Sequence, residues 1–212
     1  MGSHNEIEIK FPVDDVRALT RRLRKSGFRP VTRRTHEMNT LYDLPGQMLR
    51  ERGELLRLRK YGPEWVLTHK AKGKAGRHKT RVETEAKVAD GAKMEAILRA
   101  LGFVPTFRYE KFRAEWSDGK GHVVVDETPI GNFGEIEGPS RWIDRTAQLL
   151  QIPQSDYITA TYVELFFQWK KQTGNSANEM TFKTIRSKKH NRLFDGGHTS
   201  HPASRERTPG LH

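Results

Sequence analysis

Short segments in which ionised and apolar side chains alternate recur along the chain, and this alternation constrains the fold more than any other feature. In NEIEIKF, residues 5–11, Glu6, Glu8 and Lys10 occupy alternate positions with apolar residues between them. Successive side chains of a β-strand point to opposite faces, so these three charged groups must share one face. The other face is apolar and packs on a core, while the charged face contacts either water or a polar interior.

The same pattern recurs in five later segments. Their charged alternate positions are Arg57 and Arg59, then Lys79, Arg81, Glu83 and Glu85, then Lys111 and Arg113, then Asp126, and then Glu135 and Glu137. For a single strand, a half-exposed antiparallel sheet explains such alternation. Surface charge is usually mixed, however, and not separated into carboxylate strands and guanidinium strands. The recurrence therefore favours a closed sheet whose charged faces line a polar tunnel.

A tunnel of this kind is expected to bind a ligand, because buried charges are costly unless they pair or bind ions. Carboxylates at alternate positions are hard oxygen ligands suited to Mg²⁺ or Mn²⁺, and pairs of Arg and Lys bind phosphate oxygens. Together they predict a site for a metal-bound polyphosphate. The sequence contains no Walker-type GxxxxGK[ST] motif, so side chains and not a backbone loop would bind the phosphates.

Three helices are expected between the strands. The first follows the two aspartates at residues 14–15 and ends at Gly27, the second follows Asp90 and ends at Gly102, and Ser140 is expected to cap the third. SGFRP and LGFVP close the first two helices 75 residues apart, and ETEAK repeats the ExExK pattern 77 residues after Glu6. The order strand, helix, Gly-Phe-x-Pro, strand is thus written twice, which predicts a duplication.

Strands are expected between these helices and after them. Their approximate bounds are residues 5–11, 31–42, 54–60, 64–72, 78–88, 104–117, 121–127, 133–137 and 157–168. The last of these contains TYVELFF and is interpreted as the final strand of the barrel.

The ordered set of motifs resembles the CYTH superfamily, the triphosphate tunnel metalloenzymes, which include class IV adenylyl cyclases, thiamine triphosphatases and inorganic triphosphatases. The motifs in order are ExExK at Glu6, RLR at Arg57, the lysine of VLTHK at Lys70, RxExE at Arg81, KxR at Lys111, Asp126, and EIE at Glu135. The resemblance covers residues 5–168. It implies an α+β fold, an eight-stranded antiparallel β-barrel tunnel with flanking helices, and metal-dependent attack on a triphosphate.

The resemblance also implies roles for individual residues. The side chains expected to bind the triphosphate are Lys10, Arg57, Arg59, Lys70, Arg81, Lys111 and Arg113. The expected metal ligands are Glu6, Glu8, Glu83, Glu85, Asp126, Glu135 and Glu137, with Mg²⁺ or Mn²⁺ as the cofactor. Glu6, Glu8, Lys10 and Glu85 are expected to take part in catalysis.

Three functions are compatible with this reading. A class IV adenylyl cyclase, which converts ATP to cyclic AMP and pyrophosphate, is favoured by YDLPGQMLRERGELLRLRKYG and by the YVEL ending. A thiamine triphosphatase or inorganic triphosphatase uses the same charged tunnel and is the alternative. A non-catalytic module that binds polyphosphate or RNA is the third, because the C-terminal segment of the chain is basic.

The charge distribution indicates two regions. Half of the excess positive charge lies from Lys170 onward, in a segment with few apolar residues, so residues 1–171 are expected to form the tunnel domain and residues 172–212 a basic, disordered tail. No apolar run is long enough to span a bilayer, so a cytoplasmic protein without a membrane partner is expected. Nucleic acid is not the expected partner, and a homodimer is left open.

Overall fold

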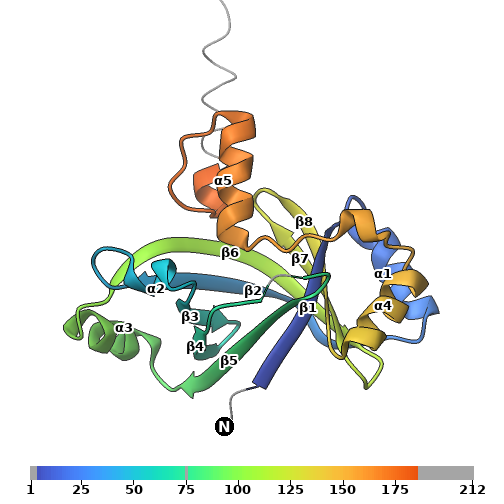
Figure 1. Cartoon of the computed structure of the whole chain (residues 1–212), viewed down its shortest axis with the longest axis horizontal. Helices are drawn as coiled ribbons and strands as arrows, with labels where there is room; N and C mark the ends of the chain where they lie inside the picture. The colour runs from blue at the N-terminus through green and yellow to red at the C-terminus, as the bar shows by residue number, and fades with distance from the viewer. Residues whose placement is uncertain (1–3, 75, 186–212) are drawn as a thin grey trace, which may run out of the picture.

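Eight antiparallel strands close into one barrel in the computed structural model, which describes residues 4–74 and 76–185 (Figure 1). The strands follow one another around the barrel in the order β1-β5-β4-β3-β2-β6-β7-β8. Their bounds are β1 His4–Pro12, β2 Arg29–Asp43, β3 Leu55–Tyr61, β4 Glu64–Lys70, β5 Lys79–Val88, β6 Val104–Ser117, β7 His122–Thr128 and β8 Gly131–Glu137. The expected α+β fold with an eight-stranded antiparallel barrel and flanking helices is confirmed.

The strands expose their two faces to different environments, as the alternation predicted. On β1 the charged side chains point into the barrel, whereas Ile9 and Phe11 are buried on its outside. There they pack with Leu19 of helix α1 (Val16–Lys25) and Ile143 of helix α4 (Ser140–Leu149), which lie together at one side of the barrel (Figure 1). These apolar faces thus form a core outside the barrel, and ionised groups line a cavity in its interior.

The sequence repeat corresponds to a repeated structural unit. The unit β1-α1-β2 has the same order as β5-α3-β6, in which α3 spans Gly91–Ala100. In each unit an aspartate, Asp15 or Asp90, caps the helix by accepting a hydrogen bond from a backbone amide three residues later. Each helix ends at a glycine with positive φ, 87° at Gly27 and 89° at Gly102, a conformation that residues with a Cβ rarely adopt.

The barrel topology carries the same symmetry. If β1 is exchanged with β5, β2 with β6, β3 with β7 and β4 with β8, each strand keeps the same two neighbours, and the order around the barrel runs in the opposite direction. The two units therefore pair with each other through equivalent strands, β1 with β5 and β2 with β6. This arrangement is consistent with the duplication that the sequence predicted.

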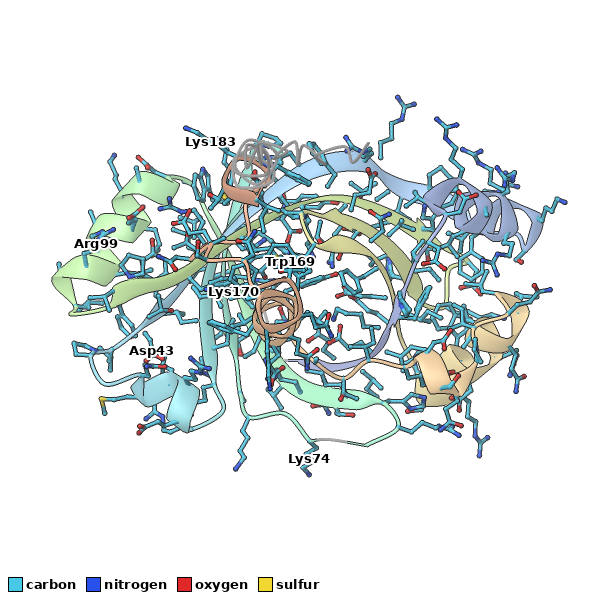
Figure 2. All side chains as sticks on the ribbon, turned by 90° about the horizontal axis from the view of Figure 1, so that it is seen from above. Asp43, Lys74, Arg99, Trp169, Lys170 and Lys183 are labelled. Carbon is cyan, nitrogen blue, oxygen red and sulfur yellow. The ribbon has the colours of Figure 1, made fainter. Side chains whose placement is uncertain are left out.

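The segment expected to be the last barrel strand is instead helix α5, Tyr162–Thr173, so that prediction is wrong. Thr161 and Glu164 form a capping box, in which each side chain binds the other residue's backbone amide. Tyr162 and Phe166, four residues apart, lie on one helical face and are buried against the apolar end of the barrel interior. Seen from above, α5 is viewed end-on over the middle of the barrel (Figure 2).

The boundary expected at residue 172 lies inside α5, and the chain that follows is packed as far as residue 185. Met180 exchanges backbone hydrogen bonds with Arg108 and Glu110 of β6, and Ala177 and Ile185 are buried in the same apolar cluster. This segment has few apolar residues, but those named here are buried in the cluster that also contains Phe166 of α5. The rest of the expected tail, residues 186–212, lies outside the described residues.

Short helical segments that were not expected include α2 (Met48–Glu51) and a 3₁₀ turn at Gln154–Asp156. Ser140 was expected to cap the third helix, but Pro139 occupies the N-cap position and Ser140 is the first residue of α4. In the described residues, no helix combines the length and the apolar composition needed to cross a bilayer.

Candidate active site

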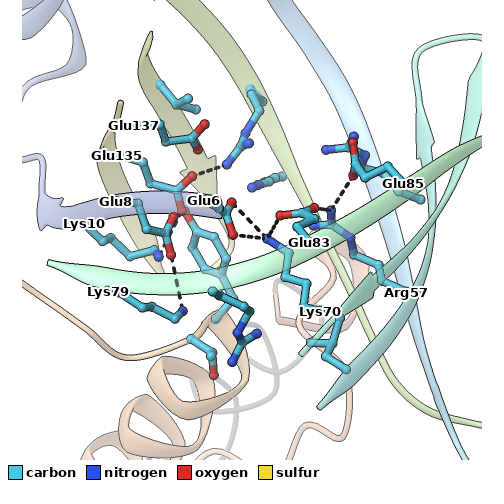
Figure 3. Close-up of a pocket in the computed structure, with 18 of the residues that line it drawn as sticks. Glu6, Glu8, Lys10, Arg57, Lys70, Lys79, Glu83, Glu85, Glu135 and Glu137 are labelled. Atoms are coloured by element: carbon cyan, nitrogen blue, oxygen red, sulfur yellow. Dashed lines mark hydrogen bonds and ion pairs between the residues drawn. The ribbon is translucent and has the colours of Figure 1, made fainter. Parts of the chain in front are cut away.

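The barrel interior contains a charged cavity of about 260 Å³, large enough for on the order of ten or more waters or for a polyatomic anion (Figure 3). Eight cationic and seven carboxylate side chains of the described residues line it. The cations are Lys10, Arg57, Arg59, Lys70, Lys79, Arg81, Lys111 and Arg113, and the carboxylates are Glu6, Glu8, Glu83, Glu85, Glu115, Glu135 and Glu137. All seven cations expected to bind triphosphate therefore line one cavity.

Six of the seven carboxylates expected to bind metal also line this cavity, and Asp126 does not. The Asp126 side chain is fully buried behind the wall. It accepts hydrogen bonds from Lys111 Nζ at 2.8 Å, from both Nε and Nη2 of Arg113, and from the Tyr162 hydroxyl at 2.6 Å. Asp126 thus holds Lys111 and Arg113 in place without lining the cavity itself.

Three carboxylates converge on one side of the cavity. Oxygens of Glu6, Glu8 and Glu137 lie within 4.8 Å of one another. Glu8 of β1 pairs directly with Glu137 of β8, and like charges that face each other across strands are destabilising. Burial, together with Glu135 and other nearby carboxylates, raises the pKa of Glu137 to about 8. A hard divalent cation such as Mg²⁺ or Mn²⁺ fits this donor set, since it would offset the repulsion.

Lys70 joins this cluster to the neighbouring strand. Its Nζ lies 2.8 Å from Glu6 Oε2 and 2.7 Å from Glu83 Oε2, so one ammonium bridges two carboxylates (Figure 3). Burial alone would raise the pKa of Glu6, but Lys70 and a hydrogen bond from Glu83 lower it to about 2. Burial and the adjacent Glu6 carboxylate raise the pKa of Glu83 to about 7, despite the opposing effect of Lys70. The pair therefore shares a proton near neutral pH.

The remaining expected metal ligands are paired with cations. Glu135 accepts from Lys10 Nζ at 2.9 Å and from Arg113, and despite burial these cations hold its pKa well below the ordinary value. Glu85 lies 3.5 Å from Arg57 Nη2 and 3.4 Å from Arg59 Nη2. These two carboxylates neutralise and orient cations, and the structure does not group them with the three convergent glutamates.

Three arginines of the cavity keep unpartnered donors. In the described residues, the Nε atoms of Arg57, Arg59 and Arg81 are buried without a hydrogen-bond partner. A buried donor that lacks an acceptor costs about 1–3 kcal/mol, so these groups favour a ligand that brings acceptor oxygens. Phosphate oxygens are suitable acceptors, and arginine binds them with good geometry.

Several residues of the site were not predicted, and Glu37 is the clearest case. It is fully buried, pairs with Lys111 in the β2–β6 register, and its carboxylate lies 3.5 Å from Lys111 Nζ. Burial opposes ionisation, yet Lys111, Arg113 and other cations lower the pKa of Glu37 far below its ordinary value. The alternation of Glu37, Asn39 and Leu41 in the second expected strand was a signal that could have placed it inward.

Tyr162 was missed because its segment was interpreted as a strand. Its ring lies under two ammonium groups, with Lys10 Nζ 4.7 Å and Lys111 Nζ 4.6 Å from the ring centroid. Tyr109 and Glu115 also line the cavity without having been assigned to it, and Lys79, which was expected on a charged strand face, had been given no role in binding. Lys79 Nζ lies 3.3 Å from Glu8 Oε1, so a cation borders the carboxylate cluster on the β5 side as well.

The fold and the cavity define a class of protein, an antiparallel barrel with a charged interior suited to metal and phosphate. A family model described as the CYTH domain matches residues 4–162, and the chain belongs to this family. A protein of Methanocaldococcus jannaschii, named provisionally as an adenylate cyclase, is 29% identical over 171 residues, covering 76% of this chain and 97% of the relative.

Solved structures have the same fold. A protein of Vibrio parahaemolyticus, described provisionally as an adenylate cyclase, superposes with a TM-score of 0.68 at 20% identity, over 76% of this chain and 97% of the other. A Hippeastrum protein with a TM-score of 0.56 is 21% identical over 77% of this chain and 95% of its own. It is described as a provisional adenylyl cyclase, HpAC1, with a dominant triphosphatase activity.

Proposed function

We propose that this chain is a divalent-metal-dependent enzyme that acts on a triphosphate bound inside the barrel. One observation carries the proposal. A single cavity holds three convergent carboxylates, Glu6, Glu8 and Glu137, together with three arginines whose buried Nε donors have no partner among the described residues. A metal ion would offset the repulsion among the three carboxylates, and phosphate oxygens would accept hydrogen bonds from the three arginines.

Glu6, Glu8 and Glu137 would hold the metal ion, Mg²⁺ or Mn²⁺. When bound, such an ion supplies positive charge that stabilises negative charge developing on phosphate oxygens. The other carboxylates of the expected metal set, Glu83, Glu85, Asp126 and Glu135, contact cations in the structure. The proposed contribution of Glu85, Asp126 and Glu135 is to position those cations, and Glu83 has a further role in the reaction proposed below.

The chain's own cations bind and orient the substrate. Arg57, Arg59 and Arg81 donate to phosphate oxygens through the groups that lack partners, and Lys10 and Lys111 add positive charge from fixed positions over the Tyr162 ring. Fixed donors of this kind stabilise the transition state because they do not need to reorganise during the reaction.

Cyclisation of ATP is the reaction proposed first. The ribose 3′-hydroxyl oxygen forms a bond to the α-phosphorus, the bond from that phosphorus to the bridging oxygen breaks, and pyrophosphate leaves with the electron pair. The hydroxyl proton must pass to a base, and Glu83 is suited to accept it because its pKa of about 7 lies near the operating pH. The name of the M. jannaschii relative supports this choice.

Hydrolysis of the terminal phosphate is the second candidate. It uses the same cations and carboxylates, with water in place of the ribose hydroxyl as the nucleophile. The description of the Hippeastrum protein, whose dominant activity is that of a triphosphatase, favours it. Thiamine triphosphate and inorganic tripolyphosphate are then the substrates to compare with ATP.

Phosphorus NMR of the products tests the proposal. The protein is incubated with Mg²⁺ or Mn²⁺ and, separately, with ATP, thiamine triphosphate or tripolyphosphate. Cyclic AMP with pyrophosphate identifies a cyclase, and orthophosphate with a diphosphate identifies a triphosphatase. Absence of metal-dependent turnover of all three would contradict the proposal and favour the non-catalytic polyphosphate-binding alternative.

The double variant Glu6→Gln with Glu8→Gln tests the metal site. It is expected to reduce metal-dependent turnover by at least about 100-fold, the order of loss when a major electrostatic contribution is removed. Glu64→Gln with Glu95→Gln is the matched control, because it removes two carboxylates that form ion pairs outside the cavity. Equal activity of the two double variants would exclude Glu6 and Glu8 as metal ligands.

A further inference from the structure

Residues 16–36, which form α1 and the first part of β2, are strongly basic. They contain eight arginines and lysines and no aspartate or glutamate, a charge of +8 in a chain whose net charge is +12. Seven of these eight side chains are exposed. This set, called here the α1 basic surface, consists of Arg17, Arg21, Arg24, Lys25, Arg29, Arg33 and Arg34.

On α1 the cations occupy the side of the helix opposite the core. Arg17, Arg21 and Arg24 are four and three residues apart, so they follow one stripe of the helix. Leu19 and Leu23, on the other side, are buried in the core outside the barrel. Figure 2 shows side chains that end in nitrogen projecting from α1 into solvent. The α1 basic surface therefore lies outside the barrel, and none of its residues lines the charged cavity.

The helical part of this surface adjoins the strand part through Trp116 of β6. The Arg24 guanidinium lies 5.4 Å from the centre of the Trp116 ring, a cation–π contact that restricts the arginine side chain. The next residue of β6, Ser117, pairs with Arg29 at the start of β2. Cations of the helix and of the strand thus form one continuous surface.

Most of these charges lack a compensating carboxylate. Within the described part of the chain, only Arg21 and Arg34 of this surface have a carboxylate oxygen within 4.0 Å, from Asp15 and Glu127 respectively. Like charges four residues apart, as at Arg17 and Arg21, destabilise a helix. The helix dipole favours the cations of the last turn, but it disfavours Arg17 in the first turn. Local stability therefore does not account for the cluster.

The duplicated helix α3 provides an internal comparison. It has exposed alanines at the positions equivalent to three exposed cations of α1. The equivalent pairs, each 75 residues apart, are Arg17 and Ala92, Arg21 and Ala96, and Lys25 and Ala100. The cations that α3 does carry, Lys93 and Arg99, form ion pairs with Asp90 and Glu95. Because the same helix of the same fold forms without unpaired cations, those of α1 favour an external anionic partner.

The composition of the surface indicates which polyanion fits it. Seven of the eight basic residues are arginines, whose planar guanidinium binds two phosphate oxygens at once. Membrane-surface helices need an apolar face, but within residues 16–36 only Val31 exposes a large apolar side chain. Single strands are bound by stacking on aromatic rings, and Phe28, the one phenylalanine, tyrosine or tryptophan of this segment, is buried. The backbone of a duplex needs cations alone.

We propose that the α1 basic surface binds the phosphate backbone of a nucleic-acid duplex, independently of base sequence. This interaction goes beyond the triphosphate chemistry of the barrel, because it uses a separate surface and a polymeric partner. The expectation that nucleic acid is not a partner considered the charge of the tunnel domain as a whole. Carboxylates elsewhere in that domain offset the positive charge that is concentrated in residues 16–36.

Fluorescence anisotropy with labelled duplexes of roughly 20 base pairs, at about 50 to 200 mM salt, tests the proposal. DNA and RNA duplexes are compared, and both have hydroxyl ends, so that no terminal phosphate can enter the barrel. The unmodified protein is expected to bind with a dissociation constant that rises steeply with salt. Equal binding of the two duplexes indicates recognition of the shared backbone, and preferential binding of one names the duplex that is the partner.

The triple variant Arg17→Ala, Arg21→Ala and Lys25→Ala gives α1 the alanines of α3. It should raise the dissociation constant at least about tenfold and reduce the slope of its logarithm against that of the salt concentration by about 3, one for each lost phosphate contact. Alanine favours helix, so the fold should be kept. Arg29→Thr with Arg33→Thr tests the strand part of the surface independently, and the expected reduction in slope is about 2.

The matched control removes three exposed lysines at the opposite side of the barrel, where α3 lies (Figure 1). Its substitutions are Lys60→Ala, Lys87→Ala and Lys93→Ala, which change the net charge by the same amount as the triple variant of α1. The control should bind duplexes like the unmodified protein. Turnover of triphosphates should be the same in all these variants, since none of the substituted residues lines the charged cavity.

Three results would overturn the proposal. One is the absence of duplex binding at about 50 mM salt. Another is an equal loss of affinity in the α1 variant and in the lysine control, which would show that only net charge matters. The third comes from vesicles that contain phosphatidylserine. If the α1 variant loses binding to these vesicles but keeps the affinity for duplexes, the surface binds a membrane instead.

Discussion

At the scale of single residues, the site shows how neighbours decide what a glutamate can do. Glu6 is held ionised by Lys70, with a pKa of about 2, whereas Glu83 beside the same lysine has a pKa of about 7. Glu137 lies among other carboxylates, and its pKa is about 8. Side chains of one type thus supply a permanent charge, a group that exchanges protons near neutral pH, and a ligand that must lose a proton before it binds metal.

Glu137 predicts a pH dependence of stability without metal. Its pKa of about 8 in the folded protein exceeds the ordinary 4.5, so the folded state keeps a proton that the unfolded state releases. This contribution is complete below about pH 4.5 and is lost as the pH rises through about 8. The free energy of unfolding is measured by denaturant titration in the presence of EDTA, at about pH 5 and at about pH 9. Between these two pH values Glu137→Gln should lose at least about 1.4 kcal/mol less of this free energy than the unmodified protein. Equal losses would contradict the raised pKa.

The raised pKa of Glu137 also predicts that metal binding releases protons. Below pH 8 an ion must displace the proton of Glu137, so the dissociation constant for Mn²⁺ should fall as the pH rises and level off above about 8. Calorimetry in buffers with different ionisation enthalpies measures the released protons directly. A dissociation constant that does not change between about pH 6 and about pH 8 would exclude Glu137 as a ligand.

At the scale of elements, α5 decides the shape of the site. It covers the apolar end of the barrel interior, and its N-cap Thr161 and its first residue Tyr162 reach the charged cavity. The alternation visible in TYVELFF is equally compatible with helical spacing over so short a stretch, and the capping box formed by Thr161 and Glu164 selects the helix. Because a helix turns through about 100° per residue, Phe166 and Phe167 then face different surroundings.

Two neighbouring substitutions in α5 should therefore differ in their effect on stability. Phe166 is fully buried and its ring centroid lies 5.2 Å from that of Phe107, so Phe166→Ala is expected to lower the free energy of unfolding by about 3–5 kcal/mol. Phe167 is 47% exposed, and Phe167→Ala should change the free energy of unfolding by less than about 1 kcal/mol. Denaturant unfolding of both variants measures the difference, and similar losses would show that α5 is oriented otherwise.

At the scale of the whole molecule, closure of the barrel brings charges from strands far apart in sequence into one cavity. Glu8 and Glu137 face each other because β1 pairs with β8, and Glu6 meets Lys70 across the intervening strand β5. Eight cations and seven carboxylates, counted among the described residues, line this space. Their mutual pairing is incomplete, so binding of metal and triphosphate should stabilise the whole barrel.

Ligand binding should accordingly raise the stability of the folded protein. With Mg²⁺ present, tripolyphosphate at 100 times its dissociation constant is expected to add about 2.7 kcal/mol, seen as a higher melting temperature in calorimetry. In Glu6→Gln with Glu8→Gln the part of this increase that depends on Mg²⁺ should disappear, while Glu64→Gln with Glu95→Gln should retain it. An unchanged melting temperature in all proteins would show that the cavity does not bind triphosphate.

The sequence by itself determined which side chains of a strand share a face, because alternation along a strand is a local steric property. Glu6, Glu8 and Lys10 could be assigned to one face from residues 5–11 alone, and the caps Asp15 and Asp90 were equally local. The family and the barrel followed from the order of such motifs. The roles of individual residues in catalysis stay predictions.

Only the tertiary structure decided which inward groups meet. Glu137 joins Glu6 and Glu8, whereas Glu85, also expected as a ligand, meets Arg57 and Arg59 instead. Strand register and barrel closure fix these neighbours, and both depend on hydrogen bonds between segments that are distant in the chain. For the same reason the sequence did not reveal a second cavity of about 260 Å³, largely apolar, beside the charged one. Its walls include residues of β2, β3, β6 and α5 and exist only after those elements have assembled.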